Sequence, residues 1–384
     1  MNAHPALKKW GKRALAVAAL LAAVYAGWAK RSDLEAGSRL LGHIHYPWLA
    51  LAIVLQLGSM LVFARLQRWL LRAGGVSVRL VDMVEITFAG NALGTSLPGG
   101  AAWAATWAFG QLRRRGADRV LAGWVILVAG AFSSFALFCV VAAGSWVAGS
   151  RGPVAHLRWL ALLLAAIPPA AAVGVVLSRR SPRVGAALRS AYSWSRRRVP
   201  GASKAGDAVS NVVERLHTVR PGTLGWIEVL GLALLNWLDD CGTMVAAMLA
   251  LGVHVPWRGV LVIYGLTQVS ASLPITPGGL GVVEGSMAAL LSAYGLNGAE
   301  AFGTVLLYRI VSFWGLVPLG WGAWFTLEYA QRTGKRRRPH PWAEHTHGGA
   351  APVAGRRVGP DRLRQPDPCP GCEEREERRA VAAR

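Results

Sequence analysis

Long apolar stretches, bounded by polar or basic residues, constrain the fold of this chain more than any other feature. About 20 apolar residues cross a bilayer core as a helix, because backbone N–H and C=O groups cannot stay unpaired in hydrocarbon. Only 16% of the 384 residues are charged, against roughly 25% in soluble domains. We therefore predict an all-α, polytopic membrane helical bundle with about six full spans. The spans are expected at residues 10–29, 47–64, 120–148, 157–177, 224–251 and 302–327.

Two further apolar regions, 81–112 and 258–297, are interrupted at their centres by one and the same tripeptide. Proline removes a backbone donor and clashes with the preceding helical turn, and glycine lets the chain reverse. Each arm is short for a full crossing, so we expect two re-entrant hairpins; full crossings by tilted arms are the alternative. The tripeptides are Pro98-Gly99-Gly100 and Pro277-Gly278-Gly279.

The basic clusters favour one orientation, because Lys and Arg gather in cytoplasmic loops. With a cytoplasmic N-terminus and C-terminus, every large basic cluster falls on one side, including 178–222 and 335–338. The two hairpins then enter from opposite faces. That is an inverted repeat, a build typical of transporters with a binding site near the midplane. The alternative is chance recurrence of a common tripeptide.

This topology divides the chain into five parts, and it accounts for the net charge of +22. No compact basic domain or recognition motif indicates a nucleic-acid partner. The tail cysteines, Cys369 and Cys372, are either flexible thiols or half of a zinc site with nearby histidines; we predict no metal and no cofactor. The parts are 1–39 (first span and flanks), 40–177 (first repeat half), 178–222 (basic cytoplasmic loop), 223–330 (second repeat half) and 331–384 (disordered cytoplasmic tail).

Three segments resemble a known family. They read SLPGGAAWAATWAFGQLRRRGAD (96–118), LPITPGGLGVVEGSMAALLSAYGL (273–296) and VLLYRIVSFW (305–314). Over roughly residues 40–330 the chain resembles the flippase-like transmembrane family, which includes the membrane domain of lysylphosphatidylglycerol synthase, the multiple peptide resistance factor. The resemblance implies a multi-pass protein of the bacterial plasma membrane, related to lipid translocation. It does not imply the soluble aminoacyl-transferase domain, so we expect no enzyme activity.

Polar side chains at membrane depth are the candidate site, because each is costly unless it is paired or hydrated. Backbone N–H groups at a helix break favour a phosphate, which Arg309 would grip with two hydrogen bonds. Alternatively, Glu284 and Arg309 pair with each other and only hold the hairpin against the last span. The candidate substrate-binding residues are Glu284, Arg309, Pro277, Gly278, Gly279, Asp239, Asp240, Asn91, Pro98, Gly99 and Gly100.

These residues predict a translocator that carries a lipid headgroup through a polar cavity while the acyl chains stay in the bilayer. The expected partners are anionic or aminoacylated phospholipids, or a polyprenyl-linked lipid. The sequence contains no ATP-binding loop, so alternating access of the two halves is the expected mechanism. Two alternatives remain. One is a non-transporting scaffold for an envelope-assembly enzyme, and the other is a membrane-embedded transferase. The oligomeric state is left open.

Overall fold

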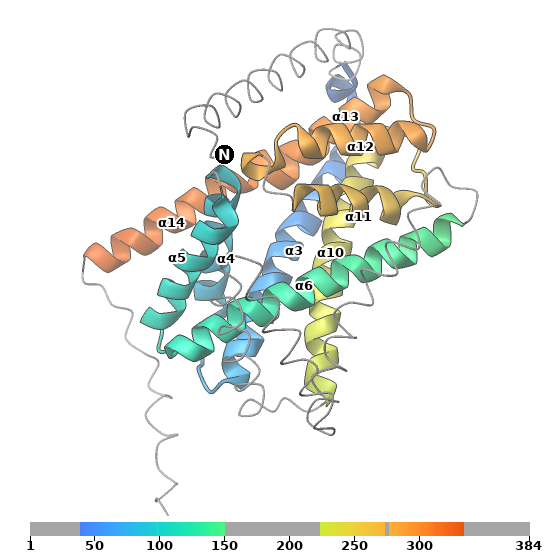
Figure 1. Cartoon of the computed structure of the whole chain (residues 1–384). Helices are drawn as coiled ribbons and strands as arrows, with labels where there is room; N and C mark the ends of the chain where they lie inside the picture. Colours follow the sequence, from blue (N-terminus) through green and yellow to red (C-terminus); the bar gives the residue numbers. More distant parts are fainter. Residues whose placement is uncertain (1–38, 98, 150–222, 273–275, 334–384) are drawn as a thin grey trace, which may run out of the picture. The chain divides into compact units, whose positions relative to one another are not determined.

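The computed structural model describes residues 39–97, 99–149, 223–272 and 276–333. All of these belong to one unit of the chain, Met1–Arg336, and every regular element in them is helical. The helices are drawn in colour in Figure 1. The predicted spans 10–29 and 157–177, the loop 178–222 and nearly all of the tail lie outside the described residues.

Within the described residues, four helical segments are long and apolar enough to cross a membrane. They coincide with four of the predicted spans, but the last segment extends beyond 302–327 at both ends. Helix α3 continues beyond residue 64 through Arg65, Arg68 and Arg72. Arginine is a good helix former, so the helix does not have to stop where the apolar run stops. The segments are α3 (Tyr46–Ala73), α6 (Arg119–Ala148), α10 (Thr223–Ala250), and the combined run of α13 (Gly298–Arg309), η4 (Ile310–Trp314) and α14 (Leu316–Arg332).

Both regions with a Pro-Gly-Gly sequence are pairs of short helices. The first pair is α4 (Leu80–Ser96) and α5 (Gly100–Arg114); the second is α11 (Val260–Ala271) and α12 (Val282–Ala293), with the 3-10 turn η3 (Pro277–Gly279) between them. Gly99 (φ +65°) and Gly278 (φ +59°) both adopt the left-handed conformation that favours glycine. The two expected helix breaks are therefore present. That each pair enters and leaves on one side of the membrane stays a prediction.

The two halves have the same kind of glycine turn and helix N-cap at corresponding positions. Each short-helix pair ends at a glycine with positive φ, Gly116 or Gly295. The next long helix starts with a side-chain cap, in which Asp118 or Asn297 accepts the backbone N–H three residues on, at 2.7 and 2.9 Å. Such caps satisfy donors that a helix start leaves free. The number of residues from Gly99 to Asp118 equals the number from Gly278 to Asn297. This is the local structure that an internal repeat predicts; the repeat and its inverted orientation stay predictions.

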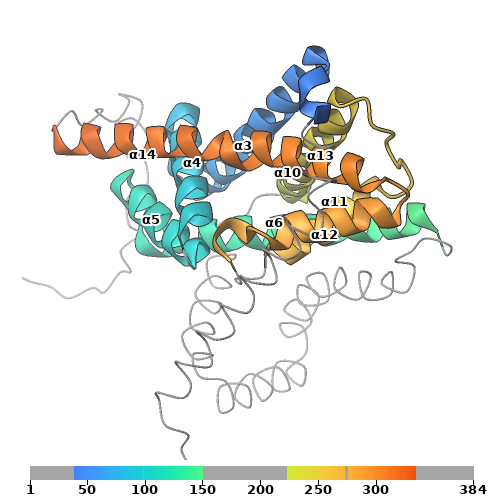
Figure 2. The same cartoon turned by 90° about the horizontal axis from the view of Figure 1, so that it is seen from above.

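Helices α3 and α10 pack along each other in an antiparallel arrangement (Figure 1). Ser59 Oγ donates to Asn236 Oδ1 at 3.2 Å, and Thr243 Oγ1 donates to the carbonyl oxygen of Ala52 at 3.4 Å. Later residues of one helix thus meet earlier residues of the other. Around this pair, α11 packs on α6 and α14 packs on α4, as Figure 2 also shows.

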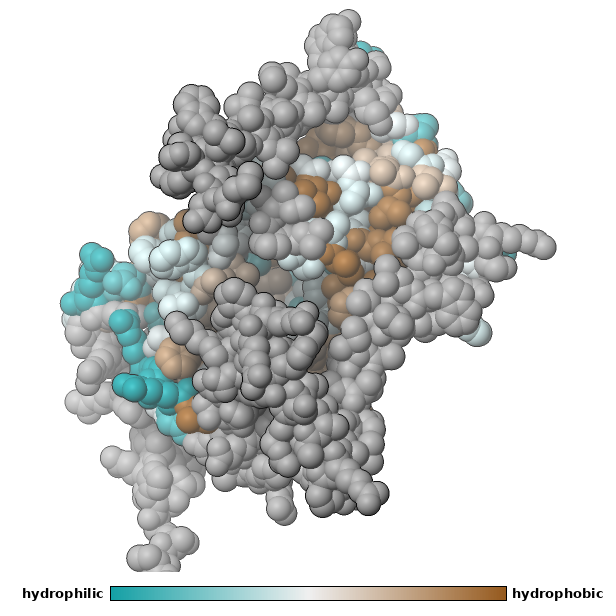
Figure 3. All heavy atoms as spheres, in the orientation of Figure 1, coloured by the Kyte–Doolittle hydropathy of each residue, from teal (hydrophilic) through white to brown (hydrophobic). Residues whose placement is uncertain are grey.

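Arginines occupy the last turns of α5 and α14, which carry Arg113, Arg114 and Arg332. In Figure 3 hydrophilic side chains gather at the ends of these two helices, whereas hydrophobic side chains cover the region of α11 and its neighbours. A polar helix end beside an apolar flank is the distribution expected of helices that reach from hydrocarbon into the headgroup layer. The described surface therefore agrees with the spans assigned from the sequence.

Candidate functional site: an ion pair at the second helix break

Glu284 and Arg309 form an ion pair beside η3. The Nε atom of Arg309 lies 2.7 Å from Oε1 of Glu284, and Nη2 donates to the carbonyl oxygen of Gly278 at 3.2 Å. The ring centroid of Phe313 is 4.2 Å from the guanidinium carbon, which adds a cation–π contact. Only 9% of the Arg309 side chain is exposed, against 31% for Glu284. Arg309 therefore ties α13 to the chain that joins α11 and α12.

The second carboxylate oxygen of Glu284 closes the N-terminus of α12. Oε2 accepts the backbone N–H of Gly281 at 2.6 Å, one of the donors that a helix start leaves unpaired. The helix dipole also favours a negative charge at this end. The sequence indicated two kinds of hydrogen-bond donor for a phosphate, a backbone N–H at the break and the guanidinium of Arg309. The carboxylate of Glu284 accepts hydrogen bonds from both.

The second break contacts the first pair of short helices, because η3 packs against α4. A Cβ atom on Gly278 would lie 2.8 Å from the carbonyl oxygen of Thr95 and would overlap the ring of Phe313. Position 278 therefore needs glycine for both its backbone conformation and its space. A Cβ on Gly99 would meet nothing within 4 Å, whereas one on Gly100 would overlap the backbone of α4. The two halves of the chain meet at Gly278 and Thr95.

The other predicted residues of the two breaks lie around this contact. Pro277 and Gly279 belong to η3 itself. Asn91 is half-buried on α4, one turn before Thr95, and its carbonyl oxygen accepts the Thr95 hydroxyl at 2.8 Å. Pro98 lies outside the described residues. The structure thus gathers Glu284, Arg309 and η3 at one place and leaves Asn91 on the neighbouring helix.

The two neighbouring aspartates of α10 face different surroundings, as successive residues of a helix do. Asp239 is half-buried and faces Gly58 of α3, where a Cβ would lie 3.6 Å from its Oδ2. Asp240 is buried, with 9% exposed. Its Oδ2 accepts hydrogen bonds from the Tyr264 hydroxyl (2.6 Å), Gln268 Nε2 (2.8 Å) and the Tyr308 hydroxyl (3.2 Å). Asp240 therefore belongs to a second polar network, which shares α13 with the ion pair, since Tyr308 and Arg309 are successive residues.

Sequence reasoning left several of these contacts out of the candidate site. Tyr264, Tyr308 and Phe313 are aromatic, and their partners could not be inferred from composition. Two signals were available. Tyr308 directly precedes Arg309, and Gln56 places an amide inside an otherwise apolar span. A polar side chain in a membrane helix usually faces another polar group inside the bundle.

The charged pair belongs to the second half of the chain. When the two breaks are superimposed in register, the positions that correspond to Glu284 and Arg309 are Ala105 and Gly130. Neither can carry a charge or donate a side-chain hydrogen bond. The first half therefore contributes backbone contacts at this site, and the second half contributes the ionisable groups.

Comparison with known proteins places the chain in a family. Residues 14–320 match the family described as the lysylphosphatidylglycerol synthase TM region. A UPF0104 membrane protein of Methanothermobacter thermautotrophicus is 32% identical over 124 residues, which are 30% of this chain and 37% of that protein. The chain thus aligns with about a third of that relative's length. The four long apolar helices and the family match together show an integral, multi-pass membrane protein. The chain belongs to the lysylphosphatidylglycerol synthase transmembrane-region family, as the resemblance predicted.

Proposed function

We propose that this protein moves the polar headgroup of a phosphate-bearing lipid across the membrane, and that Arg309 and the second helix break hold the phosphate. The observation that carries the proposal is the position of the Glu284 carboxylate. Its two oxygens accept hydrogen bonds from the Gly281 N–H and from Arg309 Nε. Helix N-termini and arginine are the two donors that proteins most readily offer to a phosphate. Glu284 is therefore an internal anion at the place where a lipid phosphate would bind.

Exchange of one anion for the other makes binding reversible. Arg309 is buried, and a buried cation without a partner is costly. If the phosphate takes over the donors as Glu284 leaves, the guanidinium stays paired throughout. Glu284 is the more exposed partner, so it is the group that can move aside. Once released, its carboxylate can accept hydrogen bonds from an amine or hydroxyl of the headgroup.

The exchange also has a mechanical consequence. Arg309 holds the Gly278 carbonyl, and Gly278 contacts α4 of the first half. A change in the partner of Arg309 therefore acts on the contact between the halves. Rocking of one half against the other is the general mechanism of transporters built from repeats with broken helices. The proposal includes no covalent step, and it places the protein in the bacterial plasma membrane with both termini in the cytoplasm.

The proposal includes a class of lipid, for which the name of the family is a support. Its name refers to a synthase of lysylphosphatidylglycerol. An aminoacylated phospholipid would offer a phosphate to Arg309 and an amine to Glu284, so both halves of the ion pair would find a partner. Anionic phospholipids and polyprenyl-linked lipids share the phosphate alone. We therefore expect aminoacylated phosphatidylglycerol to be moved faster than phosphatidylglycerol.

The test is reconstitution in liposomes with headgroup-labelled phosphatidylglycerol and its lysyl ester. We expect the wild-type protein to transfer both lipids between leaflets. Glu284→Gln and Arg309→Ala should slow the transfer by about tenfold or more, which corresponds to a loss of roughly 1.4 kcal/mol. The matched control is Arg332→Ala, which breaks an exposed pair with Glu328 at 3.4 Å and should keep the wild-type rate. Unchanged rates in both site variants would contradict the site. Absence of transfer by the wild-type protein would contradict the function.

A further inference from the structure

The buried carboxyl of Asp240 has hydrogen-bond donors at one oxygen and none at the other. Its Oδ2 accepts three hydrogen bonds from α11 and α13, and Gln56 of α3 approaches the same carboxyl. Neither Oδ1 of Asp240 nor Oε1 of Gln56 has a donor among the described residues. Both residues are buried, with 9% and 3% exposed. Buried acceptors in native proteins are almost always paired, so two neighbouring unpaired ones need an explanation.

A proton on Asp240 would turn Oδ1 from an unpaired acceptor into a donor. Oε1 of Gln56 is an acceptor available to it, and Oδ2 would keep its three donors as a carbonyl oxygen. We propose that Asp240 is a proton-binding site at the junction of α3, α10, α11 and α13. The ionised form would leave a negative charge with one unpaired oxygen in an apolar bundle, where an unpaired charge is costly.

The groups that face Asp240 support a neutral state. Its described hydrogen-bond donors, the hydroxyls of Tyr264 and Tyr308 and the amide of Gln268, are all uncharged. The adjacent titratable groups on its own helix are Asp239, whose carboxyl faces Gly58 of α3, and the buried thiol of Cys241. Within the described ranges no Lys, Arg or His forms an ion pair with Asp240, and Arg309, the next residue after Tyr308, is paired with Glu284. No positive charge therefore compensates an ionised Asp240.

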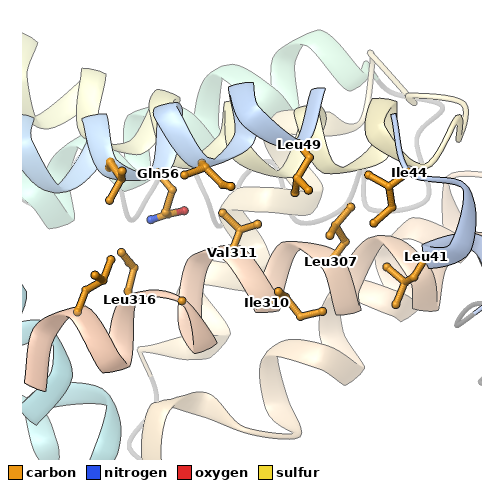
Figure 4. A pocket seen from close by; sticks show the side chains of 12 residues that line it. Leu41, Ile44, Leu49, Gln56, Leu307, Ile310, Val311 and Leu316 are labelled. Atoms are coloured by element: carbon orange, nitrogen blue, oxygen red, sulfur yellow. The ribbon is translucent and has the colours of Figure 1, made fainter. Parts of the chain in front are cut away.

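A hollow adjoins Gln56. It has a volume of about 460 Å³ and lies between α3 and the run α13–η4–α14 (Figure 4). Leu307 and Ile310 line it from the other side, whereas Arg309 between them faces Glu284 of α12. The rest of the lining is apolar, so Gln56 is the polar side chain that this hollow presents. Gln56 thus lies between the hollow and Asp240, on the face of α13 opposite the ion pair.

This site deepens the proposed function, on which the next step rests, by naming a proton as the ion that drives lipid movement. Tyr308 binds Asp240 and Arg309 binds Glu284, and the two are successive residues of α13. Gln268 lies on α11, which leads into the second break. Release of the proton leaves a buried negative charge on α10 that is held only by neutral donors, one of which is Tyr308 of α13. The demand of this charge for stronger hydrogen bonds acts on the helix that presents Arg309, so proton and phosphate binding are coupled through α13.

Infrared spectroscopy of the full-length protein in liposomes tests the proton site directly. We expect the C=O stretch of a protonated carboxyl at neutral pH, lost in Asp240→Asn and kept in Asp239→Asn, the matched change at the adjacent position. Tyr308→Phe removes one donor to Oδ2, so the band should move to higher frequency; this identifies Asp240 even if Asp240→Asn does not fold. A wild-type spectrum without the band overturns the proposal. That is the result expected if the Gln56 amide is turned so that Nε2 meets an ionised Oδ1. A band that persists in folded Asp240→Asn, or does not move in Tyr308→Phe, overturns it equally.

A pH gradient across the liposomes tests the coupling. The rate of lipid transfer by the wild-type protein should rise with the gradient in one direction and fall when the gradient is reversed. Asp240→Asn should transfer lipid at a rate that ignores the gradient, or not at all. Wild-type transfer that is independent of the gradient overturns the coupling and leaves the proposed function standing. Absence of any wild-type transfer overturns both, and the infrared result then decides the proton site alone.

Discussion

Removing either member of the Glu284–Arg309 pair should destabilise the protein, because the change leaves the other member without its partner at the helix break. Arg309→Ala removes one charge-assisted hydrogen bond to Glu284, one to the carbonyl oxygen of Gly278 and a cation–π contact with Phe313. Hydrogen bonds of charged groups contribute about 1.5–3 kcal/mol each, and breaking a buried pair costs about 3–5 kcal/mol. Glu284 is 31% exposed, so water compensates part of the loss. We expect roughly 3–4 kcal/mol for Arg309→Ala and about 2–3 kcal/mol for Glu284→Ala.

A double-mutant cycle isolates the pair itself. The double variant should be more stable than the sum of the single losses predicts, by about 1.5–3 kcal/mol. The free energy of unfolding can be measured by titrating SDS into detergent micelles and following tryptophan fluorescence. The control cycle uses Glu328 and Arg332, whose exposed pair lies one helical turn apart at 3.4 Å, and should give about 0.5 kcal/mol or less. Additivity within about 0.5 kcal/mol at Glu284 and Arg309 would refute the reasoning.

Three further predictions use the same protein. Gly278→Ala should cost more stability than Gly99→Ala. Both positions have positive φ, which costs an alanine about 1–2 kcal/mol, but only at 278 does a Cβ meet other atoms. Equal losses in the SDS titration would be the contrary result. Single cysteines at Gly298 and Arg114, in a cysteine-free chain, should react with a membrane-impermeant maleimide from opposite sides of the membrane, and reaction from one side would exclude an inverted repeat. Asn297→Ala should cost about 1 kcal/mol by removing a helix cap, and Asn297→Asp should restore it; a full loss in both variants would mean that the cap has another role.

The long helices and the two breaks could be predicted because their causes are local. An apolar segment in hydrocarbon must pair its own backbone groups, and a Pro-Gly-Gly sequence ends a helix wherever it occurs. The predicted ends of α6 and α10 lie within one residue of the observed ends. The end of α3 was missed, because hydropathy reports where a segment leaves the hydrocarbon, whereas a helix can continue into water through arginines such as Arg68.

The candidate site was predicted as a set of residues but not as an arrangement. Charge within an apolar segment singled out Glu284, Arg309 and Asp240. No local pattern separates Asp240 from Asp239, since the two are chemically identical and adjacent. Their difference comes from the helices that face them, with Tyr264 and Tyr308 meeting only Asp240.

By itself, then, the sequence determined that the chain is helical, embedded in a membrane and interrupted at two points, since each of these follows from the chemistry of one segment at a time. Only the tertiary structure decided that Arg309 meets Glu284 and that Gln56 meets Asp240. The reason is physical: hydrogen bonds and ion pairs act over a few ångströms, and whether segments far apart in the chain come that close depends on how α3, α10, α11, α12 and α13 pack together.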